Sequence, residues 1–455
     1  AVNGETKKVK HGVVVVATVA ASFGGAQPLP ETPFAAAETR ASAVCPAFQS
    51  ATATIRVAAA SAGPGLRTGR VTDPGSASDV SGLHVANAPG VPQRISALLP
   101  GPFGGTTSVA AEAGADRGFS LVACAAPGTD HWFTGVDIRD SAQSEVVVAN
   151  LDGTDAAVDL TVYGAKGRLA APRGLTVAGN AVQTISLGTL ERSSGPVTVE
   201  VGSSDGRVAA FVRQRTWAGK DPLGADWLAE GTAPASDLVI AGVPAGGGQR
   251  TLVVTNPGER TATVQLGSLT TAGPGGIVGA EQVEVPPQTT RSVDLEEGLD
   301  GQSAAVRLTS NQPVTAAVWL DTSASDARHD PAYTVATEPL PADSLWPLAL
   351  GKEATTVLQL ANPGQAEAVA AVTAGAGAST GEPTRVTVPA GSIVEMPLDR
   401  SATNLVRVQT DATDLRGALV STARLGKVRG LAVLDLVGEG SRTQSAVVFD
   451  PRAGS

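Results

Sequence analysis

The sequence has few aromatic residues, histidines and cysteines and no long apolar run past its N-terminus, and each shortage excludes a class of function. Aromatic residues make up 3% of the 455 residues, so alanine, valine, glycine and threonine must fill most of the core. The net charge is −10 and no basic cluster follows the first ten residues, which excludes an electrostatic surface for nucleic acid. No segment beyond the N-terminus is apolar for about 18 residues, so no later membrane span is predicted.

The motifs of common active sites are also missing. The sequence has no Gly-x-Ser-x-Gly, His-Glu-x-x-His, Cys-x-x-Cys or Walker motif. Of the four histidines, His131 follows a predicted turn and His329 lies in a predicted loop, and we interpret both as ordinary surface residues. Carboxylates are scattered over turns and outer strand positions, where a solvated surface is a better interpretation than a glycosidase pair. We therefore predict no enzymatic activity, no cofactor and no bound metal.

The N-terminus has the pattern of an export signal. Lys7, Lys8 and Lys10 precede an apolar run that is too short to span a bilayer comfortably. Residues 1–25 are predicted to be a signal peptide or a short membrane anchor, and residues 26–43 a stalk rich in proline and alanine. This predicts an exported protein, either secreted or on the outer face of the cytoplasmic membrane, whose membrane contact is limited to this segment.

The two cysteines, Cys45 and Cys124, are predicted to form a disulfide. An even number of cysteines in an exported chain favours pairing, and two buried free thiols are the alternative.

An internal repeat is the strongest signal in the sequence. An apolar run, an asparagine and an alternating run recur around Asn150, Asn256 and Asn362, which are 106 residues apart (256 − 150 and 362 − 256). Two further landmarks follow in the same order, a Val-x-Val pair before a turn and a longer apolar run interrupted by polar residues.

Each landmark is interpreted as a β-hairpin. Apolar residues alternate with polar ones on both sides of the turn, which is typical of strands buried on one face. Pro257 and Pro363 preset one central position of the turn, while Gly258 and Gly364 allow a positive φ at the next, which suits a type II turn. The segment from Asn150 to Asp155 has oxygens spaced as in calcium loops but lacks the terminal glutamate, so a plain β-turn is favoured. The glycine-rich run from Gly273 is interpreted as a hairpin loop.

About seven strands per repeat, with no convincing helix, predict an all-β chain of tandem immunoglobulin-like β-sandwiches. The predicted units are a divergent, disulfide-stapled β-domain at residues 44–129 and sandwich repeats at 130–236, 237–343 and 344–450. A propeller fits less well because its blades recur at about 40–50 residues. The looser segments Arg213–Ser236 and Asp321–Asp343 are interpreted as linkers or edge decorations.

The five tryptophans bear on carbohydrate binding, because sugar rings stack on exposed aromatic side chains. Trp132 and Trp346 occupy matching positions in two repeats, which favours core packing. Trp217, Trp227 and Trp319 lie near the third landmark or its exit. Core filling is the main interpretation for these three residues, and a ligand platform is the alternative.

The order of these motifs resembles that of an actinobacterial family of exported proteins, described as a domain of unknown function. The shared features are the basic and apolar N-terminus, Cys45-Pro46, Cys124 ahead of Trp132-Phe133, and Leu-x-Asn-Pro-Gly turns such as Leu360–Gly364. Members are often labelled large extracellular alpha-helical proteins, which the strand periodicity here contradicts. The resemblance covers nearly the whole chain and implies an envelope-associated protein with no known activity.

Two functions follow from these patterns. The first is a non-catalytic scaffold or protein-interaction partner in the cell envelope, which would bind an envelope membrane protein or cell-wall component through the sides of an elongated string of domains. The alternative is a glycan-binding or adhesive module of the envelope.

Overall fold

The computed structural model describes residues 40–88, 90–99, 101–190, 192–321, 330–351, 354–375, 381–399 and 404–437, which belong to one compact unit, Thr39–Ser455. The predicted signal or anchor segment and residues 26–39 of the predicted stalk lie outside the described residues. Residues 40–43 correct the stalk prediction, because they begin a strand that pairs with Gln93–Leu98 in a sheet. None of the described helices is long and apolar enough to cross a membrane.

The described residues form an all-β fold of many antiparallel sheets, which confirms the predicted fold class. The strands fall into four two-sheet sandwiches, which we call the N-terminal sandwich and sandwiches 1, 2 and 3. The N-terminal sandwich contains β1 (Arg40–Cys45), β2 (Thr54–Ser61), β3 (Arg67–Arg70), β4 (Asp73–Asp79), β5 (Leu83–Asn87), β6 (Gln93–Leu98), β7 (Phe103–Ala111) and β8 (Gly118–Ala123). Sandwich 1 contains β9 (Asp130–Val136), β10 (Ala142–Ala149), β11 (Ala156–Gly164), β12 (Gly167–Leu169), β13 (Leu175–Val177), β14 (Val182–Ser186), the 3₁₀ turn η1 (Leu187–Thr189), β15 (Val197–Asp205), β16 (Ala209–Ala218) and β17 (Asp221–Leu228).

The remaining strands build two sandwiches of similar order. Sandwich 2 contains β18 (Ala235–Val243), β19 (Gln249–Asn256), β20 (Ala262–Thr270), β21 (Gly273–Gly276), β22 (Gln282–Val285), β23 (Thr289–Asp294), the helical turn α1 (Glu296–Leu299), β24 (Ala304–Asp321) and β25 (Pro331–Val335). Sandwich 3 contains β26 (Asp343–Pro347), β27 (Ala354–Asn362), β28 (Ala368–Gly375), β29 (Thr384–Val388), β30 (Ser392–Leu398), β31 (Leu405–Thr410), β32 (Arg416–Leu425) and β33 (Val428–Asp435).

The repeated landmarks connect the two sheets of a sandwich, so the prediction that each landmark is a hairpin was wrong. In sandwich 1, β10 pairs with β14 and β16, whereas β11 pairs with β12, β13 and β15. The chain on either side of Asn150 therefore belongs to facing sheets. Alternating apolar and polar residues show only that one side of a strand is buried. The same alternation is expected whether the next strand pairs in the same sheet or lies in the facing sheet.

The asparagine side chains hold these crossings together. Asn256 is fully buried, and its Nδ2 donates to the carbonyl oxygens of Arg260 (2.7 Å) and Val285 (2.9 Å). Its Oδ1 accepts the Gly258 amide at 3.0 Å. Asn150 and Asn362 make the corresponding bonds in their own sandwiches.

The prediction of a type II turn was also wrong. Gly258 and Gly364 are not among the residues with positive φ. A Cβ on Gly258 would lie 3.2 Å from Asn256 Oδ1, so glycine here makes room for the carboxamide that closes the turn.

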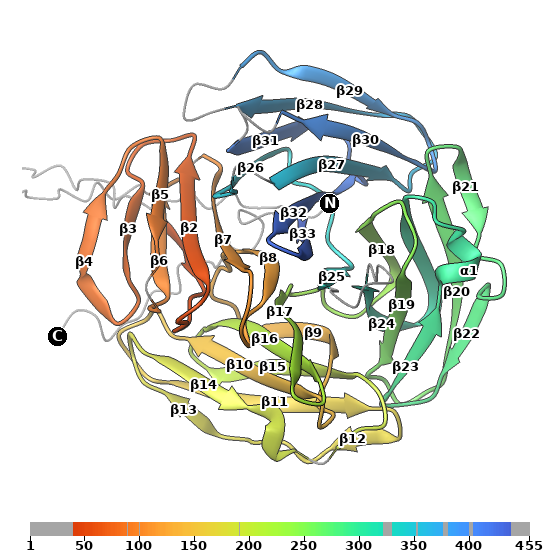
Figure 1. Cartoon of the computed structure of the whole chain (residues 1–455), viewed down its shortest axis with the longest axis horizontal. Helices are drawn as coiled ribbons and strands as arrows, with labels where there is room; N and C mark the ends of the chain where they lie inside the picture. The colour runs from red at the N-terminus through yellow and green to blue at the C-terminus, as the bar shows by residue number, and fades with distance from the viewer. Residues whose placement is uncertain are drawn as a thin grey trace, which may run out of the picture. The chain divides into compact units, whose positions relative to one another are not determined.

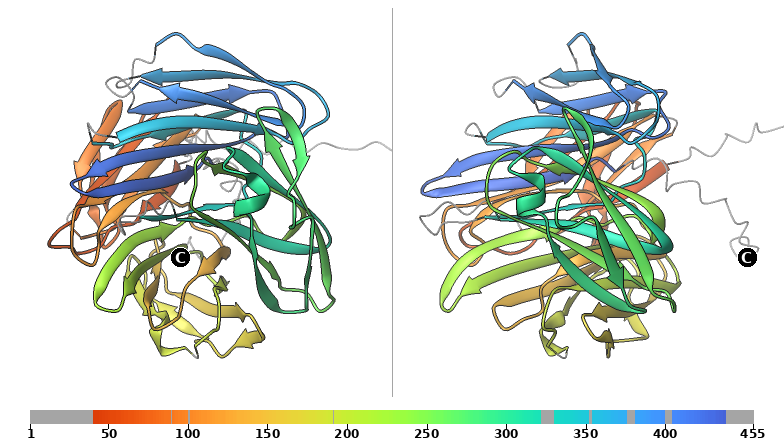
Figure 2. Two further views of the ribbon diagram at one scale, coloured as in Figure 1. Left: turned by 45° about the vertical axis from the view of Figure 1, so that its right-hand side comes forward. Right: turned by 90° about the vertical axis from the view of Figure 1, so that its right-hand side faces the viewer.

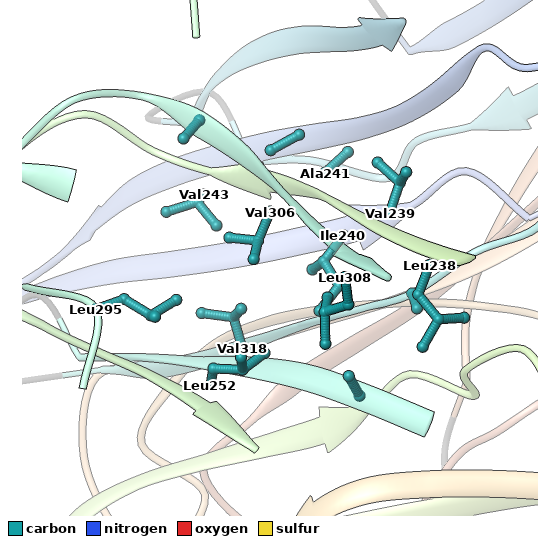
Figure 3. Packing of buried hydrophobic residues seen from close by; sticks show 14 of the residues in the cluster. Leu238, Val239, Ile240, Ala241, Val243, Leu252, Leu295, Val306, Leu308 and Val318 are labelled. Atoms are coloured by element: carbon teal, nitrogen blue, oxygen red, sulfur yellow. The ribbon is translucent and has the colours of Figure 1, made fainter. Parts of the chain in front are cut away.

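The third landmark crosses between the sheets as well. In sandwich 2 it is one continuous strand, β24, whose first half pairs with β18 and β20 and whose second half pairs with β19 and β25. Leu252, Val306, Leu308 and Val318 from these strands fill the space between the sheets (Figure 3). A single parallel pair, Thr270 with Ser392, joins β20 to β30 of sandwich 3, whose strands lie beside those of sandwich 2 in Figure 2.

The last strands of the four sandwiches, β8, β17, β25 and β33, meet one another. Contacts run from β8 to β17, from β17 to β25, from β25 to β33 and from β33 back to β8, and the four sandwiches lie around them (Figure 1). The predicted looser segments are therefore neither plain linkers nor outer decorations, because they contain β17 and β25. The expectation of an elongated string of domains is corrected by the same contacts, since Thr39–Ser455 forms one compact unit.

The predicted disulfide is confirmed. Cys45 ends β1 and Cys124 directly follows β8, so the bond joins the two sheets of the N-terminal sandwich. Both cysteines are buried.

Candidate functional site

A cleft of about 240 Å³ opens between sandwiches 1 and 2 and brings together two of the predicted tryptophans, Trp217 and Trp319. Both side chains are half-buried. Polar and apolar side chains from both sandwiches surround them, as is typical of sites for small ligands.

The floor of the cleft is one face of a sheet in sandwich 2. Thr251 of β19, Trp319 of β24 and Tyr333 of β25 lie side by side in register across three neighbouring strands. The next row of the same face contains Gln249 and Asp321. Because side chains alternate along a strand, the neighbouring residues point the other way into the sandwich core, as the buried Leu252 and Leu320 do.

The opposite wall comes from sandwich 1, where a β-bulge places Trp217. The register between β16 and β17 shifts between Thr216 and Trp217. Such a shift re-aims a side chain, and both of these consecutive residues line the cleft. The backbone amide of Trp217 donates to the Ser141 carbonyl oxygen at 2.8 Å, which ties the bulge to the β9–β10 connection.

An ion pair and a bridging glutamine hold the polar side chains where the wall of the cleft meets its floor. Arg139 forms a forked ion pair with Asp137, with distances of 2.9 Å from Nε to Oδ1 and 2.6 Å from Nη2 to Oδ2. The hydrogen bonds from Arg139 to Asp137 raise the pKa of the guanidinium. Gln214 accepts the Asp137 amide at 2.7 Å and donates through Nε2 to the Tyr333 hydroxyl, so it links the wall to the floor. Burial raises the pKa of Tyr333, and the carboxyl of Asp226 raises it further, which keeps the phenol neutral.

Buried hydroxyls join the two sandwiches next to the cleft. Thr198 of sandwich 1 lies 2.7 Å from Thr255 of sandwich 2, which in turn lies 2.7 Å from Thr290. Thr290 donates back to the Tyr163 carbonyl oxygen of sandwich 1 at 2.8 Å. These bonds hold the two sandwiches against each other beside the cleft.

The arrangement suits a ligand with both flat apolar faces and hydroxyl groups. Indole faces supply apolar contact area, while the amides, hydroxyls and carboxylates around them donate and accept hydrogen bonds. Glycans have this combination of surfaces.

The structure places the other sequence-predicted residues elsewhere. Trp227 is only 3% exposed and packs between Phe48 and Phe211, so the ligand-platform alternative is corrected for this residue. Trp132 and Trp346 are buried, in keeping with core packing. His131 is fully buried, which corrects the surface prediction. Its Nε2 lies 2.8 Å from the Val208 carbonyl oxygen and its Nδ1 lies 3.1 Å from Glu230.

His329 lies outside the described residues, and no group of three or more possible metal ligands occurs within the described ranges. The glycine-rich run from Gly273 forms the strand β21, which pairs with β20, so the prediction of a hairpin loop there was wrong.

Sequence reasoning missed the polar half of the cleft. Tyr333, Gln214, Asp137 and Asp321 are isolated residues in no motif, up to 196 positions apart (333 − 137). Only the packing of two sandwiches brings them together.

No curated protein is significantly similar to this sequence. Among solved structures, a chain titled "Biofilm associated protein - BSP domain" is 10% identical with a TM-score of 0.14, over 89% of this chain and 96% of that chain. A TM-score this low supports no inference about fold or function. The family model described as "Family of unknown function (DUF5719)" matches residues 93–399, which is more than half of the 455 residues. The chain therefore belongs to this family of unknown function, as the resemblance in its motifs indicated.

Proposed function

We propose that this protein is a non-catalytic glycan-binding protein of the cell envelope and that the glycan binds in the cleft between sandwiches 1 and 2. The observation that carries the proposal is the presence of Trp217 and Trp319 in one cleft with surrounding hydrogen-bonding groups. It favours the glycan-binding hypothesis over a scaffold, which needs no such cleft.

The polar groups of the cleft favour binding over catalysis. A glycosidase needs one carboxylic acid that can donate a proton and a second carboxylate that acts as base or nucleophile. Both oxygens of Asp137 accept hydrogen bonds from Arg139, so this carboxylate is committed to an ion pair. We infer that Asp137 and Arg139 orient a bound sugar and do not cleave it.

The proposed location follows from the disulfide and from the predicted export segment. Disulfides persist in oxidising compartments, which include the outside of the cell. A cell-wall polysaccharide would be the glycan available there.

Binding of the purified protein to solubilised cell-wall polysaccharide, measured by isothermal titration calorimetry, tests the proposal. We expect Trp217→Ala and Trp319→Ala each to weaken binding roughly tenfold or more, because each removes a stacking surface worth more than about 1.4 kcal/mol. Trp217→Phe should retain part of the affinity. Val278→Ala is the matched control, since Val278 is 77% exposed in sandwich 2 and does not line the cleft.

Two results would contradict the proposal. One is wild-type protein that binds no polysaccharide, and the other is binding that neither tryptophan substitution changes. If crosslinking in envelope membranes then recovered one membrane protein in stoichiometric amount, the scaffold hypothesis would replace it.

A further inference from the structure

Three carboxyl groups are buried where the last strands of the sandwiches meet, and we call them the junction carboxyls. Asp226 lies in β17, Asp330 directly precedes β25, and Asp435 ends β33. Their exposed fractions are 6%, 0% and 2%. Carboxyl groups are seldom buried this completely unless they are paired with a cation or held neutral.

Asp330 links three sandwiches. Its Oδ2 accepts the backbone amides of Phe119 in the N-terminal sandwich (2.8 Å) and Leu431 in sandwich 3 (3.0 Å). Gly118 has a φ of +129°, and a Cβ there would collide with Asp330 Oδ1. A Cβ on Gly224 would lie 3.4 Å from the same oxygen. Glycines on neighbouring strands thus leave a space that the Asp330 carboxyl fills.

The other two junction carboxyls make similar contacts between strands. Asp435 accepts the hydroxyl of Thr334 at 2.7 Å and the amide of Val335 at 3.3 Å, so it binds β33 to β25. Asp226 accepts the Trp227 amide at 2.8 Å and faces Ser120 of β8.

Charges of both signs act on the junction carboxyls. Asp330 is attracted by Arg117 and repelled by Asp321 and Asp226, while Asp226 is repelled by Asp330. Glu230 lines the same small cavity as Asp435. Burial raises the pKa of Asp226 and of Asp330 well above the usual range, and it raises that of Asp435 to about 7. Ionisation would therefore place like charges in a buried interior.

Strand β25 connects the junction to the cleft. Pro331 and Tyr333 face the cleft, whereas Thr334 and Val335 bind Asp435, and Asp330 directly precedes Pro331. One five-residue strand thus serves both places, with the Thr334 side chain on the face opposite Tyr333 and Val335 binding through its backbone amide.

We propose that the junction carboxyls form a proton-dependent clamp on β25, so that the cleft binds its ligand when they are protonated and loses affinity as they ionise. The ligand half of this inference rests on the proposed glycan binding, whereas the clamp itself does not. Raising the pH ionises carboxyls in a buried position that disfavours charge, and the mutual repulsion of Asp226 and Asp330 then separates β17 from the start of β25.

The test measures two quantities from about pH 5 to about pH 9, a window that spans the raised pKa of Asp435. The first is affinity for the solubilised cell-wall polysaccharide. The second is hydrogen-exchange protection of the Phe119 and Leu431 amides, corrected for the intrinsic exchange rate. We expect affinity to fall roughly tenfold as pH rises, and protection of both amides to fall with it.

Variants assign the effect to the carboxyls. Asp330→Asn keeps a neutral acceptor of similar shape and should reduce both pH dependences, and adding Asp435→Asn should remove most of what remains. Asp221→Asn, an exposed residue of the same strand as Asp226, is the matched control and should behave as the wild type. Infrared difference spectra of the wild type follow protonation directly, in case a variant does not fold.

Other results would each overturn part of the inference. Constant affinity and protection in the wild type, or an unchanged pH dependence in the double variant, would overturn the clamp. Loss of protection on adding a chelator at acidic pH would overturn it in favour of a bound cation. Absence of binding at every pH would refute the glycan proposal, and the clamp would then be judged on amide protection alone.

Discussion

At the scale of single residues, the environments of the buried carboxyls shift their pKa values in opposite directions. Asp116 lies at the contact between the N-terminal sandwich and sandwich 1, where it accepts hydrogen bonds from Ser50, Arg213 and Arg215. Burial by itself would raise the pKa of Asp116, but these hydrogen bonds and the two arginine charges outweigh it and lower the pKa. For the junction carboxyls burial is the largest effect, and their pKa values rise.

Replacing Asp116 by alanine should destabilise the protein by about 3 kcal/mol at neutral pH, because it leaves Arg213 buried without its partner. Arg213 is 5% exposed and lies 3.2 Å over the ring of Phe48. Since the folded pKa of Asp116 is below the unfolded value, its stabilisation is present above about pH 4 and is lost as pH falls through the folded pKa. Urea unfolding at neutral and acidic pH measures both effects.

The control for this prediction is Asp79→Ala, because Asp79 is 81% exposed beside Arg67. An exposed pair should contribute less than about 1 kcal/mol. Equal losses in the two variants would contradict the assignment.

At the scale of elements, the repeated turns work through side chains that a strand pattern does not reveal. The carboxamide of each buried asparagine reaches the second landmark of its own repeat, at Val177, Val285 or Val388. Both landmarks are visible in the sequence but their contact is not, because a hydrogen bond from a side chain to a distant carbonyl oxygen produces no periodic pattern of residues.

Asn256→Ala should cost about 2–3 kcal/mol, since it leaves the buried carbonyl oxygen of Val285 without its donor. Asn256→Asp should cost at least as much, because it keeps the acceptor for Gly258 but turns an oxygen toward two carbonyl oxygens. Urea denaturation provides the measurement, with the exposed Gln265→Ala as control. An Asn256→Asp variant as stable as the wild type would show that the crossing does not depend on these bonds.

The second turn of each repeat contains a left-handed residue at the same place. Asn180, Gln288 and Gly391 have φ values of 53°, 54° and 65°. Gln288→Gly should therefore stabilise the protein by roughly 0.5–1 kcal/mol, as the strain of a side chain at positive φ outweighs the added freedom of the unfolded chain. Thermal unfolding measures the change, and a loss of stability would show that the side chain of Gln288 contributes more than its strain costs.

At the scale of the whole molecule, contacts between their last strands make the four sandwiches interdependent. Each terminal strand contacts strands of two other sandwiches, and the junction carboxyls hydrogen-bond across these boundaries. A string of independent domains would unfold in several steps, whereas this arrangement favours a single cooperative unfolding step.

We expect a single unfolding transition in urea, reported identically by tryptophan fluorescence and circular dichroism. Replacing Cys45 and Cys124 by serine should lower the free energy of unfolding by about 4 kcal/mol, because the disulfide closes a loop of 79 residues in the unfolded chain. The whole transition should move to lower urea concentration. A variant in which only part of the signal shifts would indicate that the N-terminal sandwich unfolds independently.

The sequence by itself determined the strand content, the threefold recurrence and the cysteine pairing, because burial on one face, turn chemistry and cysteine number act over short stretches of chain. It could not determine which strands pair or which turns cross between sheets, since the same alternation serves both arrangements. The tertiary structure alone decided the location of the cleft and of the junction carboxyls. The cleft residues meet because sandwiches 1 and 2 pack together, and the junction carboxyls meet because the last strands of the four sandwiches do. No local pattern encodes either contact.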